Sequence, residues 1–346
     1  MFRRFSLVTV LFAATCIIAH DAAAQSVVDF YKGKQVSIYV GSEAGSGFDA
    51  YARLVARHIG KHIPGNPTVV PTNKPGAGSL NMTNSLVVAG PKDGTVIGAP
   101  QSSAAVEQLL HLLSRGGTAA KYDATKLHWL GSASQDIFVL FDWHNAKPRS
   151  FSDLLSTEML MASSGPNTVG SLIAVVLNKI FGTKIKLITG YQASGAGLLA
   201  MERGEIEANA MAYASVATMR PDWIKDQKIR FLAQMGMKPH AKLKGIPFVL
   251  DLAKTPEDRS VLELVFAKYQ MGRPYFVPQD VPKNRLDALR AAFDETMKHP
   301  DLLVDANKSR IEINPVSGAE VQAMVEKLYQ TPEPLARRTR EILGTE

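Results

Sequence analysis

One pattern recurs along the chain and limits what it can fold into: a short apolar run, a loop rich in glycine and small polar residues, then an amphipathic run. The first copy is "QVSIYVGSEAGSGFDAYARLVARHI" (residues 35–59), and the second is "PTVVPTNKPGAGSLNMTNSLVVA" (67–89). Short apolar runs indicate strands, and apolar residues at helical spacing indicate helices. Their alternation predicts an α/β protein with mostly parallel sheets.

The same alternation predicts most of the remaining elements. Strands are expected at 95–99, 158–163, 184–189, 206–212 and 228–236, and further apolar runs lie at 126–133 and 136–142. Helices are expected at 150–155, 168–181, 195–204, 259–268, 283–298, 318–329 and 332–343. No long linker separates the α/β regions. A chain of this kind often passes twice between its two domains, so discontinuous domain boundaries are expected.

The glycine-rich loops lie where α/β proteins bind ligands. Each follows the carboxyl end of a predicted strand and precedes a helix N-terminus, whose unpaired N–H groups attract anions. Glycine lets the backbone approach a ligand closely. In the first loop Ser46 is expected to be the N-cap, with Asp49 three residues later as in a capping box, and this structural role for Asp49 is favoured over a ligand contact. The second loop, read alone, is also consistent with a simple tight turn.

Two similar loops follow later in the chain, "SSGPNTVGS" (163–171) and "TGYQASGAGLLA" (189–200). With two loops in each half, the sequence predicts two lobes whose helix N-termini point into a shared cleft. Such a cleft suits a small carboxylated ligand that is captured by domain closure.

Composition and missing motifs exclude several classes of function. Hydrophobic residues make up 46% of the 346-residue chain and charged residues 21%, which is typical of globular proteins. The net charge of +7 suits an anionic ligand, but the only dense basic cluster is Arg337, Arg338 and Arg340, so nucleic-acid binding is not expected. The first loop lacks the Lys-Ser/Thr of a P-loop, and no G-x-S-x-G elbow is present. His58 and His62 lack the glutamate of a zinc motif, so neither a metal nor a cofactor is expected.

The N-terminus has the features of an export signal. Arg3 and Arg4 precede an apolar stretch from Phe5 to Ile18, shorter than the roughly 20 residues that span a bilayer. An A-x-A site at 22–24 predicts cleavage before Gln25, so residues 1–24 are assigned to a signal peptide and the mature protein to the periplasm. The only cysteine, Cys16, lies in that leader, so disulfides and cysteine catalysis are excluded from the mature protein.

Taken together, the loop motifs resemble those of the extracytoplasmic solute receptors of tripartite tricarboxylate transporters, the TctC or Bug family. The resemblance rests on five motifs in order: "AGSGFDAYARLVARHI", "NKPGAGS", "PKDGTVIGA", "SSGPNTVGS" and "TGYQASGAG…ERGEIEA". It implies a type II periplasmic-binding-protein fold with two lobes, a ligand cleft and a hinge. It also implies capture of an organic acid without catalysis, as a monomer that delivers the acid to membrane permease subunits.

The resemblance also implies which residues hold the ligand. The first-lobe set is Ala44, Gly45, Ser46, Gly47 and Asp49 with Pro75, Gly76, Ala77, Gly78 and Ser79, and the second-lobe set is Ser164, Gly165, Asn167 and Thr168 with Ala193 and Ser194. Lobe 1 is expected to comprise residues 25–135 and 250–346, and lobe 2 residues 136–249. Arg53, Arg57 and Arg273 could neutralise an acid but are left out of this set, because solvated helix positions and the beginning of a strand account for them.

Three departures from the family pattern bear on ligand identity: Ser42-Glu43-Ala44 in the first loop, "PGAGS" in the second and "YQASG" in the fourth. A carboxylate at Glu43 beside an anion site is unfavourable unless it faces solvent or meets an ammonium group. Two other functions stay open: a ligand sensor for a membrane kinase, and an exported enzyme acting on a carboxylate. The enzyme needs an acid–base pair or a nucleophile, and Asp49 is the only ionisable residue that a motif places in the cleft.

Overall fold

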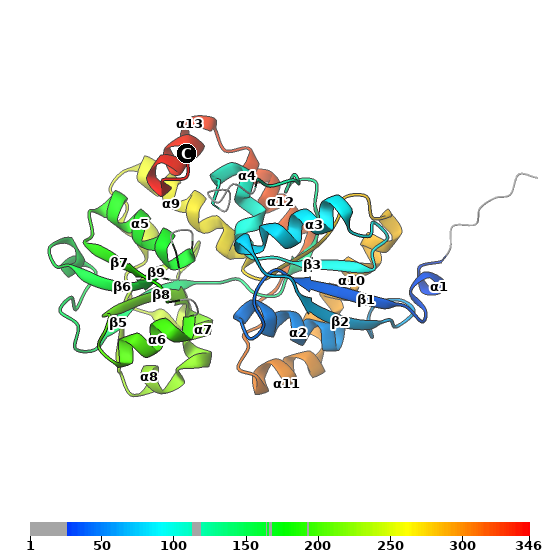
Figure 1. Cartoon of the computed structure of the whole chain (residues 1–346), viewed down its shortest axis with the longest axis horizontal. Coiled ribbons are helices and arrows are strands. Elements are labelled where there is room, and N and C mark those ends of the chain that lie inside the picture. Colours follow the sequence, from blue (N-terminus) through cyan, green and yellow to red (C-terminus); the bar gives the residue numbers. More distant parts are fainter. Residues whose placement is uncertain (1–25, 113–118, 164, 166–167, 192–193) are drawn as a thin grey trace, which may run out of the picture.

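Two separate sheets organise the chain into two α/β lobes, which lie side by side in Figure 1. The computed structural model describes residues 26–112, 119–163, 165, 168–191 and 194–346. The predicted signal peptide, with Cys16, therefore lies outside the described residues. Within the described residues, no helix is long and apolar enough to cross a membrane.

The first lobe is built on a six-stranded sheet with the order β11-β4-β10-β3-β1-β2. Its strands are β1 (Gln35–Val40), β2 (Thr68–Asn73), β3 (Val96–Ala99), β4 (His128–Ser132), β10 (Pro274–Val277) and β11 (Val316–Ser317). Strand β1 runs parallel to both β2 and β3. The carboxyl ends of these three strands therefore meet at one edge of the sheet.

Local sequence explains why the first units of this lobe form. In β1, Val36, Ile38 and Val40 are buried and alternate with less buried residues, as expected for a strand with one face on the core. Helix α2 (Gly47–Ile59) buries Leu54, Val55 and Ile59 at helical spacing and packs against β2 and β1.

The second lobe is built on a five-stranded sheet with the order β7-β6-β8-β5-β9. Its strands are β5 (Phe138–Trp143), β6 (Met159–Ser163), β7 (Ile185–Thr189), β8 (Ala208–Ala212) and β9 (Ile229–Met235). Strand β6 runs parallel to β7 and β8, whereas β5 runs antiparallel to β8 and β9.

The α/β class is confirmed, but the expectation of mostly parallel sheets is wrong. Strand β10 is antiparallel to both of its neighbours, β3 and β4, just as β5 is antiparallel to β8 and β9. Each of these two strands follows a crossover from the other lobe. Each therefore enters its sheet from the opposite direction to the strands that begin within that lobe.

The two crossovers, residues 133–137 and 268–273, lie side by side and run in opposite directions. Backbone hydrogen bonds join them from Ala133 N to Arg273 O (3.0 Å), from Gly272 N to Ser134 O (3.0 Å) and from Asp136 N to Tyr269 O (2.8 Å). This double connection, which we call the hinge, is the place where the chain passes twice between the sheets.

Helices cover both sheets and complete the core. They are α1 (Val27–Tyr31), α2, α3 (Leu80–Ala89), α4 (Glu107–Leu110), α5 (Val169–Phe181), α6 (Ser194–Glu202), α7 (Tyr213–Met219), α8 (Pro221–Lys225), α9 (Pro256–Ala267), α10 (Lys283–Lys298), α11 (Pro300–Lys308), α12 (Gly318–Tyr329) and α13 (Glu333–Leu343). Helices α10 and α11 pack against α2 in the first lobe. Helix α13 packs against both α9 and α5, so the C-terminal helices reach the second lobe (Figure 1).

The periodicity-based elements are confirmed within a few residues, namely strands β1 to β9 and helices α2, α3, α5, α6, α9, α10, α12 and α13. Strand β10 was expected only as a strand that begins near the "GRP" of 272–274, and β11 was not expected. The helix expected at 150–155 is the 3-10 helix η4 (Ser152–Leu155). Helices α1, α4, α7, α8 and α11 were not expected. Each is short or begins at a proline, so its apolar periodicity is too brief to detect.

Candidate functional site

A cavity of about 900 Å³ is lined by residues from both lobes. From the first lobe come residues 41–48 and 75–78, which are the first and second glycine-rich loops, and residues 101–103 after β3. The second lobe contributes the ends of β6 and β8, the starts of α5 and α6, and residues of α7. The loops predicted from the sequence thus meet around one cavity.

The first loop is held by the N-terminus of α2. Ser46 is the N-cap, and its hydroxyl accepts a hydrogen bond from the Asp49 N–H at 3.2 Å, as predicted. The Asp49 carboxylate reaches back one residue further than a capping box requires and accepts from Gly45 N–H at 2.8 Å. The Ser42 and Ser46 hydroxyls lie 2.8 Å apart and fix the curve of the loop.

Asp49 also joins the first loop to the second. Its Oδ1 accepts a hydrogen bond from the Asn73 side-chain amide at 2.9 Å, and its Oδ2 pairs with Arg53 Nε at 2.9 Å. Burial alone raises the pKa of Asp49, but hydrogen bonds from Arg53, Gly45 and Asn73 outweigh it and lower the pKa below 3.8. The carboxylate is 3% exposed and does not line the cavity.

The second loop has an unusual backbone. Gly76, Ala77, Gly78 and Ser79 all have positive φ, at 127°, 45°, 60° and 82°. Two of the four are not glycine, and such strain persists only where neighbouring contacts enforce it. The Ser79 hydroxyl supplies them: it donates to Gly41 O and accepts from Gln101 N, both at 2.9 Å. Ser79 is fully buried and does not line the cavity.

In the third loop three hydroxyl groups donate hydrogen bonds to the carbonyl of Gly165. It accepts hydrogen bonds from the hydroxyls of Ser163 (3.0 Å), Thr168 (2.9 Å) and Ser171 (2.7 Å). Gly165 has a φ of 157°, and Thr168, Val169 and Gly170 begin α5 at the cavity. Small residues and hydroxyl groups therefore place the N-terminus of α5 at the wall of the cavity.

The fourth loop reaches the cavity with Tyr191 and Gly195. Two residues further along α6, a Cβ at Gly197 would stand 2.7 Å from Asn209 Nδ2 and 3.0 Å from Ala162 Cβ. Glycine there lets α6 pack closely on the cavity ends of β6 and β8.

The predicted ligand residues fall into three groups. Those that line the cavity are Ala44, Gly45, Ser46, Gly47, Pro75, Gly76, Ala77, Gly78, Gly165 and Thr168. Asp49 and Ser79 lie behind the loops and shape them. Ser164, Asn167 and Ala193, together with the side chain of Ser194, lie outside what the structure describes.

Arg273 also lines the cavity, although it was not among the predicted ligand residues. Its side chain is 5% exposed and forms an ion pair with Asp136, whose side chain is 2% exposed. Its Nη1 also donates to Gly272 O at 2.8 Å. The sequence signal that could have indicated it is the "GRP" at 272–274, a glycine that allows close approach beside a cation. At Gly272 a Cβ would stand 2.5 Å from Asp136 Cγ.

The other charged residues of the described cavity lining are exposed: Glu43, Arg310 and Glu312. Glu43 is exposed at the wall of the cavity. The backbone at Arg310 and Glu312 joins the lobes, because Arg310 O accepts from Thr218 of α7 and Glu312 O accepts from Tyr51 of α2, both at 2.7 Å. Among the described residues, no cluster of side chains suits a metal ion.

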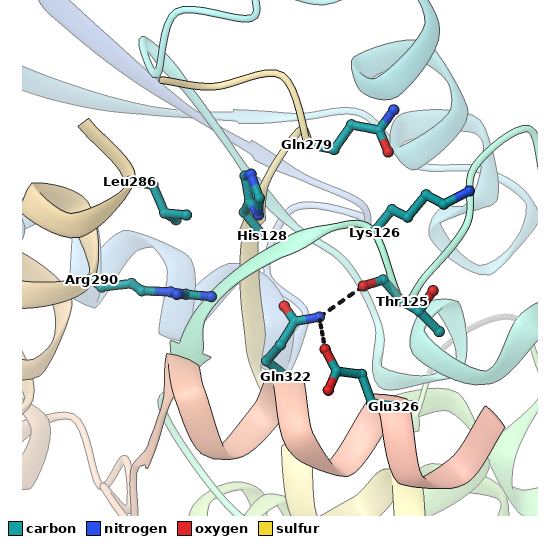
Figure 2. A pocket seen from close by; sticks show the side chains of 8 residues that line it. All are labelled: Thr125, Lys126, His128, Gln279, Leu286, Arg290, Gln322 and Glu326. Atoms are coloured by element: carbon teal, nitrogen blue, oxygen red, sulfur yellow. Dashed lines mark hydrogen bonds between the residues drawn. The ribbon is translucent and has the colours of Figure 1, made fainter. Parts of the chain in front are cut away.

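A second hollow, of about 440 Å³, lies between β4, α10 and α12 (Figure 2). Most of its lining side chains are polar, and several of them bind one another or the backbone. The Gln322 amide donates to Thr125 O (2.8 Å) and to Glu326 Oε1 (3.0 Å), and Arg290 donates to Trp129 O (2.9 Å). No described residue of the glycine-rich loops lines it, so the cavity between the lobes is the better candidate site.

Comparison with solved structures identifies the fold. A TctC solute binding protein from Polaromonas has a TM-score of 0.66 at 16% identity, over 91% of this chain and 100% of that chain. The periplasmic binding protein BugD gives 0.66 at 17%, over 91% and 99%. An R. palustris protein with adipate gives 0.65 at 20%, over 90% and 97%. Neither a scan against protein-family models nor a search of curated proteins gives a match.

The chain therefore has the two-lobed fold of periplasmic solute-binding proteins. More particularly, it has the fold of the TctC and Bug receptors, which the sequence resemblance predicted.

Proposed function

We propose that this chain is an extracytoplasmic solute-binding receptor. It captures a small organic acid between its lobes and delivers it to a membrane transporter of the tripartite tricarboxylate type. The observation that carries the proposal is the convergence of glycine-rich loops from both lobes on one cavity. Strand ends and helix N-termini are where α/β proteins bind anionic groups.

The nature of the cavity supports binding without chemistry. A volume of about 900 Å³ is within the usual range for small-molecule sites. The buried carboxylate in its lining, Asp136, forms an ion pair with Arg273. Asp49 accepts a hydrogen bond from Gly45 of its own loop. Neither is placed as a free acid or base, which supports a receptor over an enzyme. The adipate in one solved structure of the same fold supports a carboxylate as the ligand class.

The remaining features of the proposal follow from this role. We assign residues 25–135 and 250–346 to lobe 1 and residues 136–249 to lobe 2. Membership of the two sheets supports this division, whereas the contact of α13 with α5 ties the C-terminal end to both lobes. Residues 1–24 would direct the chain to the periplasm, where it would act as a monomer with permease subunits as partners.

A thermal-shift screen of the purified protein tests this function. The panel contains adipate, malate, citrate, glutamate and benzoate. A ligand at 100 times its dissociation constant stabilises the folded state by about 2.7 kcal/mol, which raises the melting temperature measurably. A shift with one chemical group, without consumption of the acid, is expected. No shift with any acid, for a protein shown to be free of copurified ligand, would contradict the proposal.

A further inference from the structure

Arg273 has unused hydrogen-bonding capacity at the cavity wall. A guanidinium carries five N–H groups, and among the described residues only Nη1 donates hydrogen bonds, to the Asp136 carboxylate and to Gly272 O. Nε is buried without a hydrogen-bond partner among the described residues. Nε is therefore closed to the cavity, whereas Nη2, which also has no partner among the described residues, is the donor that a ligand can meet.

The free edge of this guanidinium lies beside the first glycine-rich loop. A Cβ placed on Gly47 would stand 3.7 Å from Arg273 Nη2 and 3.8 Å from Ser215 Oγ of the second lobe. The space that Gly47 leaves open therefore lies between the lobes and next to Nη2. Nη2 is the accessible atom of this edge, and a hydrogen bond from a guanidinium N–H to a carboxylate is a strong, charge-assisted one.

The surroundings hold the guanidinium in place without using that edge. The Arg273 side-chain carbon Cζ lies 4.4 Å from the centroid of the Phe48 ring and 5.0 Å from that of Tyr51. Aromatic rings near a guanidinium stabilise its charge and restrict its motion. Asp136 fixes Nη1 from the other side. A buried arginine that is oriented in advance loses little entropy when it binds an anion.

We propose that Arg273 binds the carboxylate of the ligand directly, through Nη2 and across the gap left by Gly47. This rests on the proposed function and adds the residue that recognises the acid. Asp136 then acts as a positioning residue, because it holds the guanidinium through Nη1 and leaves the other edge free. Since the Asp136–Arg273 pair joins the two crossovers, the carboxylate binds at the hinge itself.

The test is isothermal titration calorimetry of the full protein with adipate, malate and benzoate as probes. One variant combines Arg273→Gln with Asp136→Asn, so that neither charge is left buried and unpaired. Its matched control combines Arg57→Gln with Asp305→Asn, a surface pair at 2.9 Å that does not line the cavity. The cavity variant is expected to weaken binding by about tenfold or more, the loss of a hydrogen bond to a charged group, and the control by less than about threefold.

A second variant covers the case in which the first does not fold. Gly47→Ala fills the gap beside Nη2 at ordinary contact distances, and alanine is the better residue for a helix. It is expected to keep its melting temperature and to weaken binding of the probe by about tenfold.

The outcomes separate the two claims. If the wild-type protein binds a probe and the folded variants bind it equally well, the role of Arg273 is overturned and the receptor function stands. If the wild-type protein binds none of the probes, the receptor function fails and the role of Arg273 fails with it.

Discussion

Asp49 and Asn73 are joined by a hydrogen bond of 2.9 Å, from the Asn73 side-chain amide to Oδ1 of the carboxylate. The same amide donates to Ser42 O at 3.0 Å, and Asp49 Oδ2 accepts from Gly45 N–H at 2.8 Å. One buried carboxylate therefore connects the two glycine-rich loops of the first lobe. The shape of the ligand site depends on a residue that does not itself face the ligand.

Replacing Asp49 with asparagine is expected to destabilise the protein by about 1–3 kcal/mol, because several donors lose a charged acceptor. Binding of the acid is expected to weaken as well, since both loops lose their connection. Urea unfolding at pH 7 measures the stability, and Asp305→Asn on the surface of α11 is the control. An Asp49→Asn protein as stable as the wild type would contradict this role.

The same carboxylate predicts a pH dependence. Its pKa is lower in the folded protein than the ordinary value of 3.8, so the unfolded chain binds the proton first as the pH falls. The stability that Asp49 contributes is therefore fully present above its ordinary pKa and is lost as the pH falls through the lowered folded value. The difference in unfolding free energy between wild type and Asp49→Asn should shrink between pH 5 and about pH 3. A constant difference would argue against this.

Replacing Gly76 with valine is expected to abolish ligand binding while the fold remains. Gly76 has a φ of 127°, and a Cβ there would stand 2.5 Å from Asn81 Nδ2. A side chain at such a φ costs about 1–3 kcal/mol, which distorts the second loop but does not unfold a domain of this size. Calorimetry measures the binding and circular dichroism the fold. A folded variant with wild-type affinity would exclude the second loop from the site.

Replacing Gly272 with alanine is expected to destabilise the hinge by about 1–3 kcal/mol. The new Cβ would lie 2.5 Å from Asp136 Cγ, so Asp136, which pairs with Arg273, must shift. Gly195→Ala, whose Cβ would lie 3.9 Å from Met219 Cε, is the control and should change stability by less than about 0.5 kcal/mol. Equal effects of the two substitutions in urea unfolding would contradict the close contact at the hinge.

Lys268 also lies in the hinge, and from its lowered pKa we expect the stability of the protein to change at alkaline pH. Burial lowers its pKa to about 8, although Glu107 opposes the shift, whereas the unfolded chain keeps the proton up to about 10.5. Between these values the unfolded state binds more protons, so the unfolding free energy contributed by Lys268 rises with pH. Urea unfolding from pH 7.5 to 10 should show this rise in the wild type and not in Lys268→Met. Parallel curves for the two proteins would refute it.

Local signals account for the part of the site that the sequence could predict. The Ser46 cap and the glycine clusters depend on residues within a few positions of one another, so they can be recognised without knowledge of the fold. The contacts of Arg273 with Phe48 and Asp136 join segments that are distant in sequence. Its burial therefore follows only from the second crossover, as does the antiparallel insertion of β10. Asp49 makes one contact of each kind. Its hydrogen bond with the Ser46 cap could be predicted from the sequence, whereas its contact with Asn73 could not.

Capture of an intact acid between the lobes is the central claim, and equilibrium dialysis tests it most directly. The purified protein is dialysed against adipate, malate and benzoate in turn, and the acid is quantified on both sides of the membrane. One class of acid is expected to be retained at one molecule per chain, with the total amount unchanged. Retention of none of them, or a fall in the total amount caused by turnover, would contradict the account.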